Sequence, residues 1–252
     1  MYPVINIGPL TLPTPAFLLI IGYFAGSYLL DKRSSSFSVN SELLDQTLWI
    51  GTLSALLGAR LSYIAASPAA FKGNILSIFS LNPALLDPVG GFVIGAAAVL
   101  LVISRHKTDI WNFLDSFTLF LGGLLPAYFL SRFSSGDGYG LPTDLPWGIY
   151  LWGALRHPVQ IYLTICAIII LVLALVYAPL KGLPAGSTFL LFTAATSSYL
   201  LFFSAFQEPV SASISGFRSI QIVSWLFLLA ALVLLNLRIR STSPKAYHEI
   251  NK

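Results

Sequence analysis

The sequence predicts an all-α membrane protein with about seven transmembrane helices. Of its 252 residues, 56% are hydrophobic and only 10% are charged, whereas soluble domains carry about 25% charged residues. The mean hydropathy is +0.80, and the aromatic content of 13% fits belts of Trp and Tyr at the two membrane interfaces. We expect one transmembrane domain over residues 1–252.

Apolar runs near the length that a helix needs to cross a bilayer, about 17–25 residues, set the expected spans. They lie at 15–31, 47–66, 89–104, 111–131, 158–179, 186–206 and 219–238. The third run is short and begins at Gly90-Gly91, so we expect it to be tilted or to pack tightly against a neighbour at its start. The first run lacks a basic segment before it, which indicates a permanent span and not a cleaved signal peptide.

The distribution of basic residues predicts the orientation of these spans, because cytoplasmic loops are enriched in Lys and Arg. One face carries nine: Lys32, Arg33, Arg105, Lys107, Lys181, Arg238, Arg240, Lys245 and Lys252. The other face carries four: Lys72, Arg132, Arg156 and Arg218. We therefore expect the amino terminus outside and the carboxy terminus in the cytoplasm.

A polar, glycine- and proline-rich segment, Gly136–Tyr162, interrupts the apolar sequence on the expected external face. Irregular backbone beside a bilayer must be buried in protein or line a wet cavity. Glycines at 136, 138 and 140 permit positive φ and close approach of other backbone. This segment is the first candidate for a functional site.

Two arginines are candidates for binding an anionic head group. Arg60 lies within the second span, where a charge is costly and often functional. The alternatives are that it snorkels or pairs with Asp87, Asp137 or Asp144. Arg132 precedes the glycine-rich turn, and guanidinium with exposed backbone N–H groups can bind phosphate. The alternative there is a plain turn with a snorkelled arginine.

The fifth span opens with Arg156-His157-Pro158, and proline suits a first helical turn. Gln160 and Tyr162 follow one turn inside and can hydrogen-bond across helices. His157 is the only histidine on the expected external face, so it is the only imidazole base available there. The alternative is a histidine that bonds a loop carbonyl at the helix start.

Several function classes have little support. Basic residues are scattered and form no stripe for nucleic acid. No His or Cys pair has the spacing of metal ligands, and no Gly-x-Ser-x-Gly elbow is present. The single cysteine, Cys166, cannot form an internal disulfide and lies in an apolar run, as a core or lipid-facing residue does. No polar stripe continues across several spans, which disfavours a channel or transporter.

These segments resemble the bacterial prolipoprotein diacylglyceryl transferase family over nearly the whole chain. The segments that carry the resemblance are Ile7–Leu10, Gly58–Tyr63, Gly90-Gly91, Gly136–Gly148, Arg156–Tyr162, Phe206–Pro209 and Gln221–Ser224. Pro-Thr-Asp-Leu-Pro-Trp-Gly at 142–148 and Arg-His-Pro-Val-Gln-Ile-Tyr at 156–162 are the most specific of them.

The resemblance implies transfer of a diacylglyceryl group from phosphatidylglycerol to the lipobox cysteine of a prolipoprotein, with glycerol phosphate leaving. It implies no metal and no cofactor, and it implies a location in the bacterial cytoplasmic membrane. A catalytic role is expected for His157. Substrate-binding roles are expected for Arg60, Arg132, Asp137, Gly140, Arg156, Gln160 and Tyr162. The expected partners are phosphatidylglycerol or another anionic phospholipid and the prolipoprotein signal peptide.

The sequence also departs from the family pattern. By the resemblance, Val89 stands where the family has a histidine, and Phe129 and Leu200 stand where it has arginines. Further departures fall at Pro15, Arg132, Ser204 and Ser135–Asp137. Arg132 can restore one cation if the fourth helix continues past Phe129, and we expect no comparable replacement for the histidine or for the polar pair of span six. Two hypotheses remain open: a divergent transferase, or an inactive lipid-binding subunit of a membrane complex with other membrane subunits as partners.

Overall fold

The computed structural model describes residues 4–7, 10–71, 85–208, 213–214 and 217–249. Lys72 and Lys252, which entered the orientation prediction, lie outside these residues, as do Gly8, Pro9 and Pro209. The chain divides into two compact units: unit 1 comprises Met1–Phe37 and Leu114–Lys252, and unit 2 comprises Ser38–Phe113. The single transmembrane domain expected from the sequence stays a prediction, and each unit is described by itself.

Seven helices in the described residues are long and apolar enough to cross a membrane, which confirms the predicted fold class. They are α1 Thr14–Arg33, α2 Ser41–Ala66, α3 Pro88–Arg105, α4 Ile110–Ser135, α5 Val159–Tyr177, α6 Ser187–Ser204 and α7 Ser219–Glu249. Short 3-10 turns lie at Ser34–Phe37 and Pro68–Phe71. The orientation of the termini stays a prediction.

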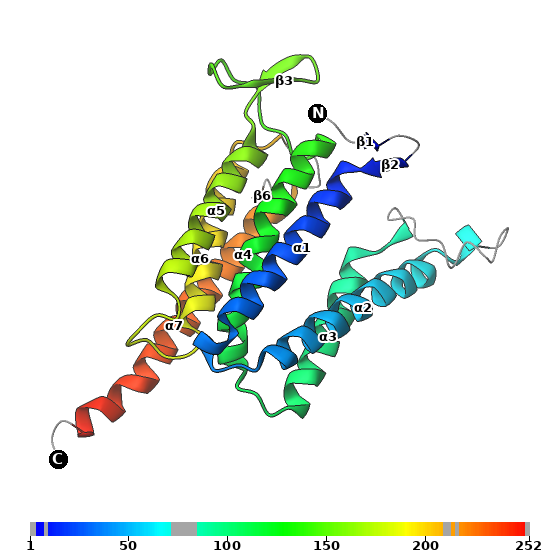
Figure 1. Cartoon of the computed structure of the whole chain (residues 1–252). Coiled ribbons are helices and arrows are strands. Elements are labelled where there is room, and N and C mark those ends of the chain that lie inside the picture. The colour runs from blue at the N-terminus through cyan, green and yellow to red at the C-terminus, as the bar shows by residue number, and fades with distance from the viewer. Residues whose placement is uncertain (1–3, 8–9, 72–84, 209–212, 215–216, 250–252) are drawn as a thin grey trace. The chain divides into compact units, whose positions relative to one another are not determined.

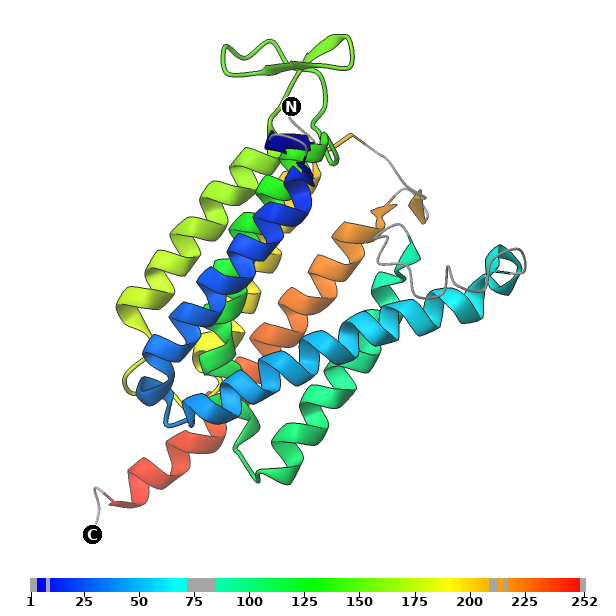
Figure 2. The same ribbon diagram turned by 45° about the vertical axis from the view of Figure 1, so that its right-hand side comes forward.

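Three two-stranded antiparallel hairpins lie between or before the helices. They are β1 Val4–Ile7 with β2 Leu10–Pro13, β3 Ile149–Leu151 with β4 Ala154–Arg156, and β5 Ser213–Ile214 with β6 Phe217–Arg218. In the β3–β4 hairpin, Tyr150 is the register partner of Leu155. This hairpin projects beyond the ends of α4 and α5, as Figures 1 and 2 show.

Unit 2 is a pair of helices, α2 and α3, packed through small residues. A Cβ added at Gly91 would lie 2.9 Å from the Ala55 carbonyl oxygen, and one at Gly95 would lie 2.9 Å from the Ala55 Cβ. Close helix approach of this kind is typical of membrane proteins. The tight packing expected at the start of the third span is therefore confirmed.

Asp87 caps the start of α3. Its carboxylate accepts the backbone N–H groups of Val89 and Gly90, each at 3.1 Å, and the hydroxyl of Ser62 donates to it from α2. The Ser62 hydroxyl, followed by these amides, holds the pKa of Asp87 below its ordinary value because all three interactions favour the charged form. The cap thus ties the two helices of unit 2 together.

Unit 1 is a bundle of α1, α4, α5, α6 and α7 (Figures 1 and 2). Helices α1 and α4 meet at glycines: a Cβ added at Gly26 would lie 2.5 Å from the Phe120 carbonyl oxygen. The core between α4, α5 and α6 is a cluster of buried side chains comprising Phe129, Val159, Leu163, Ala167 and Tyr199. This cluster positions the ends of α4 and α5 that carry the candidate site.

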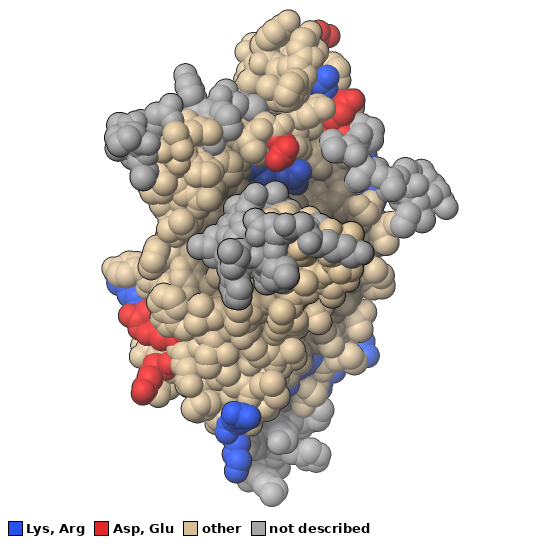
Figure 3. Space-filling model, turned by 90° about the vertical axis from the view of Figure 1, so that its right-hand side faces the viewer, with Lys and Arg blue, Asp and Glu red and all other residues tan. Residues whose placement is uncertain are grey.

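Outside the core, the helices present apolar side chains to their surroundings. Phe24, Leu57, Phe92, Val176 and Leu226 are among the exposed large hydrophobic residues. On the face drawn in Figure 3, charged side chains are few and gathered in small groups on a mainly uncharged surface. A surface of this composition is suited to lipid and not to water.

Candidate functional site

The Gly136–Tyr162 segment lies at the end of unit 1 where α4 and α6 end and α5 and α7 begin, which we call the site end. Its backbone pairs with the chain that follows α6: Leu141 N–H donates to Phe206 O at 2.8 Å, and Glu208 N–H donates to Tyr139 O at 3.0 Å. The segment is therefore held by protein, as irregular backbone in a membrane protein requires.

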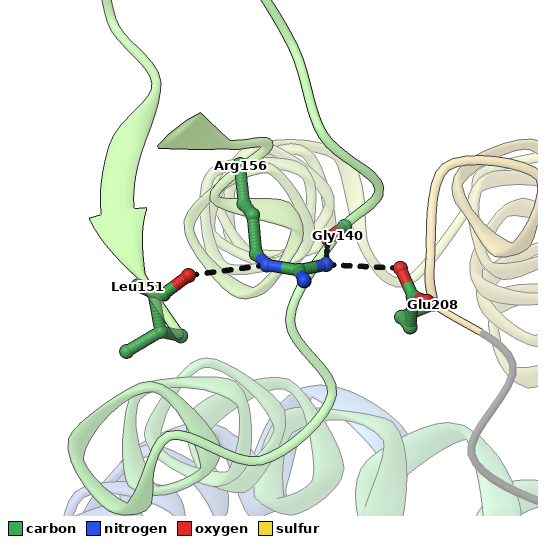
Figure 4. A network of polar contacts seen from close by, with 4 residues as sticks. All are labelled: Gly140, Leu151, Arg156 and Glu208. Atoms are coloured by element: carbon green, nitrogen blue, oxygen red, sulfur yellow. Dashed lines mark hydrogen bonds and ion pairs between the residues drawn. The ribbon is translucent and has the colours of Figure 1, made fainter. Parts of the chain in front are cut away.

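Arg156 organises this segment through main-chain carbonyl groups (Figure 4). Its guanidinium donates to Leu151 O at 3.1 Å and to Gly140 O at 3.2 Å, and it pairs with Glu208 at 2.9 Å. It also lies over the Tyr139 ring, 4.9 Å from the centroid. These contacts join the hairpin, the glycine-rich turn and the chain after α6, so Arg156 acts first as a positioning residue.

Gln160 and Gly140 also shape the turn. Gln160 is 2% exposed, and its amide donates to Asp137 O at 2.8 Å. Gly140 is buried against His157: a Cβ added there would lie 2.5 Å from the His157 Cβ, so only glycine fits. The Asp137 carboxylate is exposed and accepts the Ser135 hydroxyl at 2.8 Å. Their predicted substrate-binding roles stay predictions.

His157, Tyr162 and Trp147 form a polar chain at the start of α5. Trp147 Nε1–H donates to the Tyr162 hydroxyl at 2.8 Å, and His157 Nδ1 lies 3.5 Å from the same oxygen. The His157 ring packs on Phe206 with centroids 5.4 Å apart. His157 Nε2 makes no hydrogen bond with any residue that the structure describes.

A cavity of about 250 Å³ at the site end contains two cations, and we call it the cation cavity. Its lining residues are Leu125, Tyr128, Phe129, Arg132, Gly138, Leu163, Leu200, Gln207, Glu208, Arg218, Ser219 and Ile220. Helix α4 continues to Ser135, so Arg132 does share a face with Phe129, as expected.

The two cations are placed differently. The Arg132 guanidinium lies against Gly138, where an added Cβ would be 2.7 Å from Nη2, and it pairs with no carboxylate in the described part of the chain. Arg218 donates one bond to Ser204 O at the end of α6. Glu208 also lines the cavity but is paired with Arg156. The cavity therefore has a net positive charge and apolar walls.

A second space, which we call the apolar groove, measures about 430 Å³. It is lined by Leu145, Trp147, His157, Tyr162, Ile165, Cys166, Phe203 and Phe206. None of these lining residues is Lys, Arg, Asp or Glu. Helices α5 and α6 contribute to both spaces: Leu163 and Leu200 line the cation cavity, whereas Tyr162 and Phe203 line the groove.

Arg60 belongs to unit 2 and contacts its own unit. Its guanidinium donates to Leu85 O at 2.8 Å and lies 5.3 Å from the centroid of the Phe71 ring. Cation–π and carbonyl contacts of this kind reduce the cost of a charge within a span. Binding of a head group by Arg60 stays a prediction.

Sequence reasoning missed two functional candidates, Arg218 and Trp147. Arg218, from β6, lines the cation cavity together with Leu200. The expectation that nothing replaces the polar pair of span six stays a prediction. The signal was present in the apolar run at 219–238, because Arg218 directly precedes it and was counted on the same face as Arg132.

Comparison with known proteins confirms the resemblance. The family model described as prolipoprotein diacylglyceryl transferase matches residues 3–237. The phosphatidylglycerol–prolipoprotein diacylglyceryl transferase of Nitrosomonas europaea is 27% identical over 218 residues, covering 81% of this chain and 76% of the relative. A Campylobacter jejuni protein of the same name is 29% identical over 233 residues, covering 86% and 82%. One from Bordetella parapertussis is 32% identical over 173 residues, 63% of each chain.

The seven apolar helices and the bacterial relatives together indicate a multi-pass protein of the bacterial cytoplasmic membrane. The match to the family model spans both units, and it includes the whole of the site end as well as α2 and α3. The chain therefore belongs to the prolipoprotein diacylglyceryl transferase family.

Proposed function

We propose that this chain is a divergent phosphatidylglycerol–prolipoprotein diacylglyceryl transferase that holds the donor phosphate in the cation cavity. The observation that carries the proposal is the position of Arg132 and Arg218. They line the same cavity as Phe129 and Leu200, the two positions at which the family resemblance expects arginines. Arg132 is three residues from Phe129 on α4, and Arg218 reaches the cavity from β6, so two cations line it although neither stands at the expected position.

This arrangement fits the electrostatic demand of the reaction. The glyceryl carbon that carries the phosphate oxygen is attacked by the cysteine thiolate, a C–S bond forms, and the C–O bond breaks. The electron pair of that bond leaves with glycerol phosphate, whose negative charge increases. Two guanidinium groups in a cavity with apolar walls stabilise such developing charge more strongly than they would in water.

The remaining proton belongs to the thiol, because thiolate and not thiol is the nucleophile. His157 is the imidazole at the site end, and its Nε2 is without a partner among the described residues. With Nδ1–H donated to the Tyr162 hydroxyl, Nε2 is an acceptor and takes the thiol proton. Arg156 and Gln160 hold the turn that carries His157 and Gly138 in place.

The second candidate is an inactive lipid-binding subunit of a membrane complex. Two residues favour it, because their side-chain donors already bind protein groups. Arg156 donates to Leu151 O and Gly140 O and pairs with Glu208. The Gln160 amide donates to Asp137 O. In this candidate the cation cavity still binds an anionic phospholipid, while no thiol is modified.

One assay separates the candidates. The purified protein in phosphatidylglycerol vesicles receives a lipobox peptide, and mass spectrometry measures the thioether product and glycerol phosphate. We expect turnover, and a loss of about 10²–10³-fold for Arg132→Ala or Arg218→Ala, the effect of removing one stabilising donor. Arg105→Ala, an exposed arginine at the end of α3, is the matched control. No product from folded wild-type protein that still retains phosphatidylglycerol would favour the subunit.

A further inference from the structure

The β3–β4 hairpin and the turn before it carry exposed apolar and aromatic side chains. Trp147 is 58% exposed and Tyr150 is 74% exposed, while Leu145 and Leu155 are each 36% exposed. Tyr150 and Leu155 are register partners and lie on the same face of the hairpin, and Leu155 packs at Gly148, beside Trp147. We call these four side chains, Leu145, Trp147, Tyr150 and Leu155, the aromatic platform.

The opposite face of the hairpin is covered by protein. Ile149, Leu151 and Arg156 alternate with the exposed residues and line a small space together with Phe133 and Tyr139. The hairpin therefore has one face that packs on unit 1 and one face, the aromatic platform, that is left open.

The platform lacks the charge that a surface in water normally has. Residues 138–155 contain a single charged side chain, Asp144, whereas a segment of this length in a soluble domain carries about four or five. Contiguous exposed apolar side chains of this kind mark a surface that contacts another phase or another molecule.

A hydrogen bond sets the depth of the platform relative to the bilayer. The 19 residues of α5 rise about 28 Å at about 1.5 Å per residue, close to the hydrocarbon thickness of about 30 Å. The first turn of α5 is therefore near the edge of the hydrocarbon. Trp147 Nε1–H donates to the hydroxyl of Tyr162 in that turn at 2.8 Å. The Trp147 end of the platform thus lies at the interface, although the hairpin itself projects beyond the helices (Figure 1).

The platform is also continuous with the lipid-facing surface of α5. Ile165, Ile168 and Ile169 are 45–52% exposed along this helix, as side chains in contact with acyl chains are. Leu145 and Trp147 line the apolar groove together with Ile165. The same lipids that cover the exposed face of α5 therefore reach the platform.

From these features we propose that the aromatic platform inserts into the interfacial layer of the bilayer and anchors the hairpin there. Trp and Tyr are the side chains that favour this layer, because an apolar ring and a polar group meet in each. The Trp147 N–H is already bonded to Tyr162, so its ring enters lipid without an unpaired donor. The proposal does not depend on whether a thiol is modified.

Anchoring would fix the height of the site end. The strand after the glycine-rich turn pairs with the hairpin: Thr143 N–H donates to Leu155 O at 2.8 Å, and His157 N–H donates to Leu141 O at 3.1 Å. A platform held in the interface thereby holds the backbone on both sides of His157 at one level of the bilayer.

Trp147 is a native probe of depth once the four other tryptophans of the chain, Trp49, Trp111, Trp152 and Trp225, are replaced by Phe. The full-length variant is placed in phosphatidylcholine vesicles with lipids brominated either near the glycerol or near the end of the acyl chain. We expect Trp147 emission shifted to the blue of free tryptophan, stronger quenching by the shallow bromines than by the deep ones, and protection from aqueous iodide.

The matched control is the variant that keeps Trp225 alone. Trp225 is 60% exposed and follows the start of α7 by six residues, so it lies about 9 Å inside the helix end and should be quenched most by the deep bromines. Trp147 emission that iodide quenches as it does free tryptophan, with no effect of brominated lipid, would overturn the proposal. So would protection of Trp147 from both quenchers that varies with the protein-to-lipid ratio, the result expected for contact with a second protein.

A pair of substitutions tests the platform as a unit. In the variant that keeps Trp147 alone, Tyr150→Asp places a charge on the platform, whereas Tyr150→Phe keeps an aromatic ring. We expect Tyr150→Asp to cause loss of shallow-bromine quenching of Trp147 and a gain of iodide quenching, and Tyr150→Phe to change neither. Equal behaviour of the two folded variants contradicts insertion of the whole platform, and the depth measurement on Trp147 decides the proposal even where Tyr150→Asp fails to fold.

Discussion

Arg156 is predicted to stabilise the site end mainly through carbonyl groups and only slightly through its ion pair. Its guanidinium is 15% exposed and donates to Leu151 O and Gly140 O, while its partner Glu208 is 33% exposed. Hydrogen bonds from charged donors contribute about 1.5–3 kcal/mol each. Partly exposed ion pairs contribute about 0.2–1 kcal/mol. We therefore expect Arg156→Ala to cost about 3 kcal/mol and Glu208→Gln to cost about 1 kcal/mol or less.

The free energy of unfolding is measured by SDS titration of the protein in mixed micelles, with Arg105→Ala as the control for loss of an exposed arginine. The double variant Arg156→Ala, Glu208→Gln is expected to match Arg156→Ala, because the ion pair is already lost. A cost for Glu208→Gln equal to that for Arg156→Ala would refute the reasoning, since the carbonyl bonds would then contribute little.

Three further outcomes follow from the structure. Gly138→Ala is expected to lower both transferase turnover and the free energy of unfolding, because the new Cβ meets the Arg132 guanidinium at 2.7 Å and φ is +68°. The further substitution Arg132→Ala in the Gly138→Ala background should then reduce turnover little more. Asp115→Ala is expected to cost about 2–4 kcal/mol in the same SDS titration, because Asp115 accepts two backbone N–H groups at the start of α6 at 2.7 and 2.8 Å, and Asp115→Asn should cost less. Because the Ser62 hydroxyl holds the pKa of Asp87 below its ordinary value, this stabilisation of unit 2 is complete above about pH 4 and is lost as pH falls through the lowered pKa; a pH series of unfolding in which Asp87→Asn keeps the same acid dependence would contradict this.

The spans could be predicted from the sequence because hydropathy dominates the choice of membrane helices. The exact ends of the helices could not be predicted in this way. Helix α2 begins at Ser41, six residues before the apolar run at 47, because the Asn40 side chain caps it by accepting Glu42 N–H at 3.0 Å. Caps lie in polar sequence, and hydropathy does not detect them.

The site was predicted in part, for a similar reason. The Gly136–Tyr162 segment is contiguous in sequence, so its residues were found together. The second cation of the cavity, Arg218, comes from β6, far from Arg132 in the sequence, and only tertiary packing brings both into one cavity. The hydrogen bonds from Arg156 to main-chain carbonyl groups could not be predicted either. A sequence motif shows which side chains are present and not which backbone groups they bind.

The shortness of α3 has a consequence for the lipid that surrounds it. Its 18 residues rise about 27 Å at about 1.5 Å per residue, slightly less than the hydrocarbon thickness of about 30 Å. Glycines hold α3 closely against α2, so the two helices meet the bilayer as a pair. Hydrophobic mismatch is then relieved by thinning of the bilayer around this pair. Helix α6 also has 18 residues, so acyl-chain length acts on both units, and the protein should be most stable in bilayers of short-chain lipids.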